Sequence, residues 1–362
     1  MVKLRIGVIF GGQSKEHEVS LNSAQSIIGA LNKGKYDIIP IAITKNGYWL
    51  IGEKGEQYLS SYAGLTSENA VTLQQSESLV SLNNQEKSLV NFAEGDANGK
   101  IDLIIPMVHG TFGEDGKLQG MLEMLGLPYL FSNTLASALA MNKPKTQIVA
   151  KNVGLNVLSY CTINKNEKYN LEEIVDRLSL PIVVKPVEAG SSVGIFIAKS
   201  IQELKKSIEE DFTYCESLML EQYKKGRELT VAMMGNYQTK ALPVIEIIPQ
   251  ISDFYDYQAK YQAGGSKHVC PAEIPEEIKK KVQADAIKSF QAIGCRDLAR
   301  ADFIWSQEDN KIYFLEINTI PGMTSTSLVP EAAKVDGLDF PKFLDALIRI
   351  GLKRYKKTSS RV

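Results

Sequence analysis

In the first third of the chain, segments whose apolar residues have the spacing of a β-strand alternate with segments whose apolar residues have the spacing of a helix. Residues 4–10 form an apolar run typical of a buried strand, residues 20–31 place one apolar face on a helix, and residues 37–44 predict a second strand. A further strand is predicted at 102–108 and a helix at 115–125. This strand–helix–strand order indicates a parallel sheet and therefore an open α/β domain.

Glycines and polar residues follow two of these predicted strands. Gly11 and Gly12 come after the first strand, and the loop His109–Gly116 comes after the strand at 102–108. Open α/β sheets bind ligands at the carboxyl ends of their strands. The sequence therefore predicts a binding edge formed by these two segments.

The pattern changes near Tyr129. A helical stretch at 134–153 leads into strands at 157–163 and 181–187, further strands lie within 218–248, and a helix is predicted at 276–293. Residues 53–99 read as weakly structured strands and surface loops, and 252–272 as a long irregular segment of a length that is more often functional than idle. We predict three domains, at residues 1–128, 129–217 and 218–362, the first α/β and the others α+β.

The most informative segment is the pair of strand patterns within residues 299–318. Alternation places Arg300 and Asp302 on one face of the first strand, and Glu316 and Asn318 on one face of the second, opposite Leu315 and Ile317. A turn centred near Asp309 would set Asp302 across from Glu316 and Arg300 across from Asn318. Carboxylates directly opposite one another, with their Cβ atoms roughly 5 Å apart, would repel each other. A bound divalent cation with oxygen ligands would remove this conflict, and the alternative is a polar face in contact with water.

A second segment combines a lysine with small residues. Lys185 ends an apolar run and is followed by the Gly/Ser turn of KPVEAGSSVG, whose backbone N–H groups could approach phosphate oxygens closely. The spacing of a P-loop is absent. Glu221 and Glu228 stand at strand ends, where an acid could accept hydrogen bonds from a ribose or an adenine amino group. Taken singly, the turn could be a plain hairpin, and both acids could be surface charges.

Composition narrows the class of protein. The chain has 362 residues, 44% hydrophobic and 23% charged, with a net charge of −1, which is typical of a globular protein and gives no sign of a nucleic-acid or membrane partner. The four cysteines are widely spaced, as expected of thiols in a reducing compartment. No apolar run approaches the ~18 residues of a membrane span. We therefore expect a cytoplasmic location.

Together, these pieces resemble the ATP-grasp superfamily. The order of Lys143, Lys185 with its Gly/Ser lid, the acids Glu221 and Glu228, and the acidic hairpin is similar to that superfamily. The match narrows in the blocks FGGQSKEHEVSL, HGTFGEDGKLQG, KPVEAGSSVG, FYDYQAKY, CPAEIP and LEINTIPGMTSTSLVP, which look like those of the D-alanine:D-alanine ligase family. The resemblance spans essentially the whole chain and implies an N-terminal open parallel α/β domain followed by an ATP-grasp fold of two α+β subdomains.

The family's activity implies roles for residues on the nucleotide side. The family joins two D-alanines with ATP through a D-alanyl phosphate. By resemblance, the ATP pocket and its phosphate contacts comprise Lys143, Lys185, Ser192, Ile195, Glu221, Tyr223, Lys224, Glu228, Lys260 and Leu315. Two Mg²⁺ or Mn²⁺ ions would be held by Asp302, Glu316 and Asn318.

On the amino-acid side, Glu16 matches the acid that meets the first ammonium group, with His109 near the same substrate. Arg300 and the N–H of Gly322 would form the oxyanion site, and Ser327 with the N–H of Leu328 would bind the second carboxylate. Residues 252–272 match a mobile loop in which Tyr261 reaches toward Glu16 and Ser191, completing the catalytic set of Glu16, Ser191, Tyr261, Arg300 and Gly322. The resemblance also implies a homodimer.

Two departures and two alternatives accompany the resemblance. Asn142 stands where the family often has an aspartate, and Phe131–Asn133 stand where it often has a glycine-rich turn. A D-alanine:D-lactate or D-alanine:D-serine ligase shares almost every motif, although the lactate branch usually lacks a YDYQAKY type of loop. A non-catalytic nucleotide-binding module is the other alternative, but such proteins tend to lose the metal ligands that this chain retains.

Overall fold

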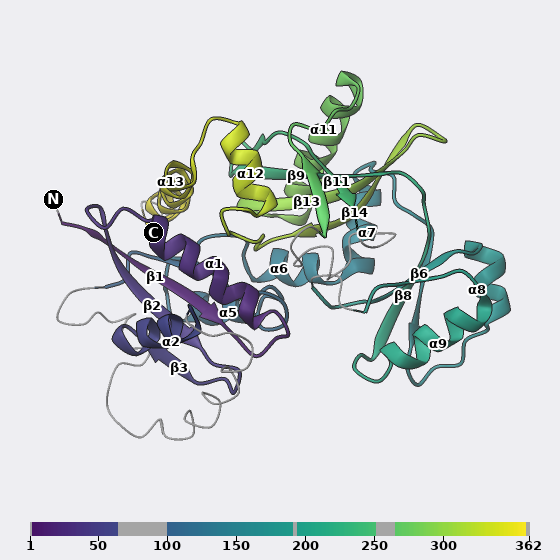
Figure 1. Cartoon of the computed structure of the whole chain (residues 1–362), viewed down its shortest axis with the longest axis horizontal. Coiled ribbons are helices and arrows are strands. Elements are labelled where there is room, and N and C mark those ends of the chain that lie inside the picture. Colours follow the sequence, from purple (N-terminus) through teal and green to yellow (C-terminus); the bar gives the residue numbers. More distant parts are fainter. Residues whose placement is uncertain (1, 64–99, 191–193, 251–264, 360–362) are drawn as a thin grey trace.

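The computed structural model describes residues 2–63, 100–190, 194–250 and 265–359. Its elements gather around three sheets, and the order in space differs from the order in the chain (Figure 1). The N-terminal sheet and the central sheet, which lies within residues 160–222, are at opposite ends, and the C-terminal sheet lies between them. Within the described residues, no helix is both long and apolar enough to cross a membrane.

The N-terminal sheet has the predicted parallel core. β1 (Leu4–Gly11) pairs in parallel with β2 (Tyr36–Ile43) and β4 (Leu103–Pro106), while β3 (Trp49–Ile51) is an antiparallel edge strand. Helices α1 (His17–Ala30) and α5 (Lys117–Met124) contribute to two separate apolar clusters that include β-strand residues. The start of the stretch expected to be weakly structured is instead helix α2 (Glu53–Ala63), which packs on β2 and β3. Residues 64–99 lie outside the described residues.

The central sheet has the order β5-β8-β6-β7 and is entirely antiparallel. Its strands are β5 (Tyr160–Asn164), β6 (Ile182–Pro186), β7 (Phe196–Ala198) and β8 (Ser217–Gln222). Helices α8 (Leu171–Leu178) and α9 (Ile201–Asp211) share one apolar cluster with these strands. Because β8 belongs to this sheet, our proposed domain limit between residues 217 and 218 would cut a paired strand. A limit after Gln222 fits the sheet better.

The C-terminal sheet positions most of the candidate site. Its order is β12-β11-β9-β13-β14, with β10 (Lys240–Ala241) paired to β9. The main strands are β9 (Arg227–Gly235), β11 (Ile245–Pro249), β12 (Ser266–Val269), β13 (Asp297–Ser306) and β14 (Lys311–Asn318). Helix α11 (Glu276–Ile293) packs on this sheet together with α6 (Thr134–Met141) and α7 (Lys143–Asn152). Helices α12 (Leu328–Val335) and α13 (Phe340–Ser359) share an apolar cluster with the N-terminal sheet. The C-terminal elements therefore build one core with the N-terminal domain.

The helical stretch predicted at 134–153 is two helices. α6 (Thr134–Met141) ends before Asn142, and α7 (Lys143–Asn152) begins after it. Asn142 caps α7 by accepting a hydrogen bond from Lys145 N, while its Nδ2 donates to Glu188 Oε1 at 2.7 Å. An aspartate at this position would place a second carboxylate against Glu188. The departure from the family pattern thus has a local electrostatic reason.

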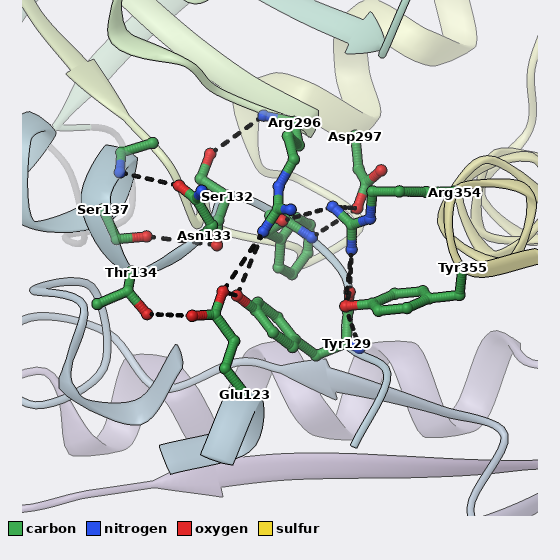
Figure 2. A network of polar contacts seen from close by, with 12 residues as sticks. Glu123, Tyr129, Ser132, Asn133, Thr134, Ser137, Arg296, Asp297, Arg354 and Tyr355 are labelled. Atoms are coloured by element: carbon green, nitrogen blue, oxygen red, sulfur yellow. Dashed lines mark hydrogen bonds and ion pairs between the residues drawn. The ribbon is translucent and has the colours of Figure 1, made fainter. Parts of the chain in front are cut away.

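Two residues near the C-terminal end of α13, Arg354 and Tyr355, are packed against the rest of the protein. Arg354, on α13, forms an ion pair with Asp297 at 3.0 Å and donates to the main-chain oxygen of Phe131 (Figure 2). Asp297 is fully buried and also accepts from Phe131 N and Asn236 Nδ2. Tyr355 donates its hydroxyl to the main-chain oxygen of Tyr129. This network joins α13, the start of β13 and the connection between the first two domains.

Candidate active site

The β13–β14 hairpin has the predicted pairing at its polar end. Asp302 lies opposite Glu316, and Arg300 opposite Asn318. This register depends on a β-bulge, because Phe303 pairs with Phe314 and Leu315 is the extra residue. The expectation that Leu315 faces away from Glu316 is not met, since both residues border the same cavity. Without the bulge, Asp302 would stand opposite Leu315.

The repulsion expected between the two carboxylates is relieved within the strand itself. Arg300 donates from Nε and Nη2 to the two oxygens of Asp302 at 2.9 and 2.8 Å. Asn318 Oδ1 accepts from Ile320 N. Among the described residues no three His, Cys, Asp or Glu side chains form a metal-binding group. The candidate metal set therefore consists of two carboxylates and one amide, all oxygen donors of the kind Mg²⁺ accepts.

A cavity of about 450 Å³ contains the residues expected on the amino-acid side. Its lining draws on α1, the loop after β4, the β13–β14 hairpin and the N-terminus of α12. The predicted site residues that border it are Glu16, His109, Lys143, Arg300, Glu316, Asn318, Gly322, Ser327 and Leu328. The fold thus brings residues from both ends of the chain to one place.

A second, more apolar cavity lies between the central and C-terminal sheets. Leu158, Val183, Ile197 and Ile304 supply apolar walls. The predicted site residues that border it are Lys185, Ile195, Glu221, Tyr223, Lys224, Glu228, Asp302, Leu315 and Glu316. Glu316 borders both cavities, so the two share a boundary at the hairpin.

One end of the larger cavity is acidic. Glu16 is buried just before α1, and a Cβ atom at Gly110 or Gly190 would lie only 2.5 or 2.7 Å from its Oε2. Glu114, which our sequence reasoning did not select, also borders the cavity and accepts from Gly110 N at 2.7 Å. Burial, and then the nearby Glu16 carboxylate, raise the pKa of Glu114 well above its usual range. Two acids in this setting favour a bound cation such as an ammonium group.

Other groups that border the larger cavity favour an anion. Ser327 is the residue before α12, and its Oγ accepts a hydrogen bond from Thr324 N. The N–H groups at the start of α12 and the guanidinium of Arg300 border the same space. A carboxylate would be stabilised there. Acidic and cationic groups in one cavity are complementary to a zwitterionic amino acid.

Lys185 is more buried than its predicted role requires. It is 6% exposed, and its Nζ donates to Glu221 Oε2 at 2.8 Å. Oε1 of Glu221, which is itself 2% exposed, has no hydrogen-bond partner among the described residues. An unsatisfied buried acceptor at the edge of an apolar cavity is suited to a ligand N–H group.

This burial changes the expected effect of replacing Lys185. A partly exposed lysine would contribute little to folding, but Lys185→Met leaves the Glu221 carboxylate buried and unpaired. We therefore expect a loss of about 3–5 kcal/mol of unfolding free energy in addition to weaker nucleotide binding. Urea unfolding and calorimetry with ATP would measure the two effects, and Lys225→Met, in the adjacent loop, is the control. An unchanged unfolding free energy would contradict this expectation.

His109 is a neutral residue within the cavity. Burial lowers its pKa to about 4, while a hydrogen bond with the backbone of Ile320 opposes that shift. Its Nε2 lies 3.5 Å from Ser23 Oγ. At neutral pH the ring is therefore uncharged and can accept or donate a hydrogen bond without adding charge.

The lowered pKa predicts a pH effect on stability. The unfolded chain takes up a proton near pH 6.5 and the folded one only near pH 4, so the contribution of neutral His109 is lost as the pH falls through this window. We expect His109→Gln to reduce the stability difference between pH 7 and pH 5 by about 1–2 kcal/mol. Urea unfolding at both pH values, compared with His268→Gln, measures this. Equal pH slopes for His109→Gln and the unmodified protein would disprove it.

Protein-family models match both the N-terminal and the C-terminal parts of the chain. Residues 5–132 match the family model described as D-ala D-ala ligase N-terminus, and residues 149–349 match D-ala D-ala ligase C-terminus. The chain belongs to the D-alanine–D-alanine ligase family. A family member, the D-alanine–D-alanine ligase of Acetivibrio thermocellus, is 38% identical over 98% of this chain and 97% of its own.

Solved structures of this family share the fold. The D-alanine–D-alanine ligase of Coxiella burnetii has a TM-score of 0.81 and 33% identity, covering 99% of this chain and 97% of its own. The VanG D-Ala:D-Ser ligase of Enterococcus faecalis has a TM-score of 0.79 and 35% identity, covering 96% and 99%. The predicted ATP-grasp fold is thus confirmed. Because a D-Ala:D-Ser ligase is this similar, the overall fold does not by itself select the second substrate.

Several residues assigned from the family resemblance lie outside the described part of the chain. These are Ser191, Ser192, Lys260 and Tyr261. The remaining predicted residues all border one of the two cavities. Glu114 was the notable omission, and its place in the HGTFGEDGKLQG block next to His109 was the available signal.

Proposed function

We propose that this member of the ligase family joins two D-alanines with ATP, forming D-alanyl-D-alanine, ADP and phosphate. The observation that carries the proposal is the pair of cavities meeting at Glu316, one apolar with charged groups at its edge and one lined by both acidic and cationic groups. A nucleotide fits the first arrangement, and an amino acid fits the second. The product is a building block for peptidoglycan, and the cytoplasm and a homodimer are the expected location and assembly.

The first cavity has features that suit ATP. Its apolar walls suit an adenine ring, and the unpartnered Glu221 Oε1 can accept a hydrogen bond from the adenine amino group. Lys224 and Glu228 border the same cavity, where Glu228 can accept from ribose hydroxyls. Lys185 borders this cavity, where it can meet phosphate charge. Lys143, whose Nζ donates to Ala189 O at 2.6 Å, borders the larger cavity.

Oxygen donors at the shared boundary fit a divalent metal. Asp302, Glu316 and Asn318 would hold Mg²⁺ or Mn²⁺, and two ions are expected in total. When bound, the metal offsets phosphate charge during phosphoryl transfer. The protein's own task is to orient the carboxylate of the first D-alanine toward the γ-phosphate, with Glu16 holding the ammonium group.

The second half of the reaction uses the cationic and N–H groups that border the larger cavity. Arg300 and the N–H of Gly322 would stabilise the oxyanion that forms when the second amine attacks the acyl phosphate, and the C–N bond then forms as phosphate leaves. Ser327 and the N–H of Leu328 would hold the second carboxylate. Because the amine arrives protonated, the site must also remove one proton before attack. By the family resemblance, Tyr261 and Ser191 would act near Glu16.

Substrate choice provides the direct test. We expect ATP-dependent phosphate release with D-alanine, dipeptide as the product, and negligible D-alanyl-D-lactate at pH 7, because the chain has the YDYQAKY type of loop that the lactate branch usually lacks. Phosphate release and mass spectrometry of products with D-alanine, D-serine, D-lactate and L-alanine measure this. Efficient incorporation of D-lactate or D-serine would favour the alternative ligases, and nucleotide binding without turnover would favour a non-catalytic module.

A further inference from the structure

Arg300 and Asp302 form a closed ion pair at the boundary of the two cavities. Both side chains are about nine-tenths buried, and the guanidinium meets the carboxylate through two parallel hydrogen bonds. Such a bidentate arrangement engages both carboxylate oxygens. Asp302 Oδ1 also accepts a hydrogen bond from Thr230 Oγ1 at 2.5 Å. In this conformation, the proposed metal ligand is already occupied by a cation of the protein.

The sheet makes this pair possible. Residues two apart on a strand project from the same face, and on β9 the residue opposite Arg300 is the small Ala232, while Thr230 stands opposite Asp302. The small side chain leaves room for the guanidinium to fold along the strand. The threonine hydroxyl then fixes the orientation of the carboxylate.

The two members of the pair border different cavities. Arg300 borders the larger cavity, which we call the amino-acid cavity, and Asp302 borders the more apolar one, which we call the nucleotide cavity. A cation that binds Asp302 from the nucleotide side must share or replace the hydrogen bonds that Arg300 makes. Arg300 would then be available to an anionic group on the amino-acid side.

We infer that the Arg300–Asp302 pair couples the two cavities: a divalent metal arriving with the nucleotide competes with Arg300 for Asp302 and releases the guanidinium toward the amino-acid cavity. This inference rests on the proposed function. Because binding linkage is reciprocal, a carboxylate that engages Arg300 also leaves Asp302 free for metal. Arg300 is then both an oxyanion group and a positioning residue for the order of binding.

Metal affinity tests the competition without a turnover assay. Mn²⁺ binding in the presence of a non-hydrolysable ATP analogue would be followed by electron paramagnetic resonance. We expect about tenfold tighter Mn²⁺ binding in Arg300→Gln, a size typical of coupling between sites. Arg300→Lys keeps the charge but loses the two-pronged contact, and we expect it to bind Mn²⁺ more tightly than the unmodified protein as well.

Arg227→Gln is a matched control. Arg227 lies on the neighbouring strand β9 and makes the same kind of bidentate contact, with Glu246. We expect its replacement to leave Mn²⁺ affinity unchanged. If the Arg300→Lys affinity equals that of the unmodified protein, or if Arg227→Gln tightens binding as much as Arg300→Gln, the effect is one of charge alone and the inference is wrong.

Asp302→Asn is expected to change metal binding and amino-acid binding in opposite directions. It should weaken Mn²⁺ binding, yet tighten D-alanine binding to the nucleotide-free protein several-fold, because a neutral amide holds the Arg300 guanidinium less tightly than a carboxylate does. Calorimetry with D-alanine measures the second effect, and general damage to the site would not improve affinity. Unchanged or weaker D-alanine binding would overturn the coupling. Absence of any Mn²⁺–nucleotide binding by the unmodified protein would instead overturn the proposed function, so the two failures are distinguishable.

Discussion

Glu316→Gln is expected to lower turnover by at least about a thousandfold, because metal stabilisation of developing charge contributes several kcal/mol to such reactions. Glu316 is the one predicted metal residue that borders both cavities. The substitution removes the ligand charge at nearly constant volume. We therefore expect the unfolding free energy to change little.

Phosphate release with ATP, Mg²⁺ and D-alanine measures the loss, and thermal unfolding monitors the fold. Glu277→Gln is the control, since Glu277 is exposed on α11 and makes the same acid-to-amide change away from both cavities. Raising Mg²⁺ should recover only part of the activity. Ordinary turnover by a folded Glu316→Gln protein at ordinary Mg²⁺ would exclude Glu316 from the metal site.

The second large effect is on stability. Arg354→Met is expected to lower the unfolding free energy by about 3–5 kcal/mol at pH 7, because it leaves the fully buried Asp297 carboxylate without its ion-pair partner. Methionine keeps much of the apolar stem, so most of the loss should come from the missing charge. The hydrogen bond from Arg354 to Phe131 O is lost as well.

The stability lost in Arg354→Met should depend on pH in a definite direction. Burial raises the pKa of Asp297, and Arg354 opposes that shift. Without Arg354 the pKa should rise further, so the folded protein holds a proton that the unfolded chain releases. The stability lost in Arg354→Met should therefore grow as the pH rises from 5 to 8.

Urea unfolding at several pH values tests both statements. Arg349→Met is the matched control, since Arg349 is exposed on the same helix and hydrogen-bonds within it. Adding Asp297→Asn to Arg354→Met should restore part of the stability by removing the buried charge. A loss below about 1 kcal/mol, or a loss that does not vary with pH, would show that the ion pair is of the weak, surface type.

Much of the candidate site could be predicted from local patterns. Strand alternation places Asp302 and Glu316 on one face, and helical periodicity predicts α11 with the same bounds that the structure has. Both signals depend on neighbours in the chain, so one sequence contains them. The roles of individual residues came from the family resemblance and remain proposals.

Other features could not be read from local patterns. Nothing near Lys185 in the sequence indicates that Glu221, 36 residues away, would bury and neutralise it. The bulge that adds Leu315 to the hairpin shifts the register between Asp302 and Phe303, and side-chain alternation along a single strand does not indicate it. The pairing of Arg300 with Asp302 needed the small Ala232 on the adjacent strand, which only strand order supplies.

The sequence alone determined the parallel N-terminal core, the acidic hairpin and the family, because these depend on periodicity and on motifs within short segments. Only the tertiary structure decided which distant groups neutralise one another. Arg354, near the C-terminal end of α13, pairs with the buried Asp297, and Lys185 pairs with Glu221. Burial and charge pairing depend on distances through space, which are set by how the three sheets pack together.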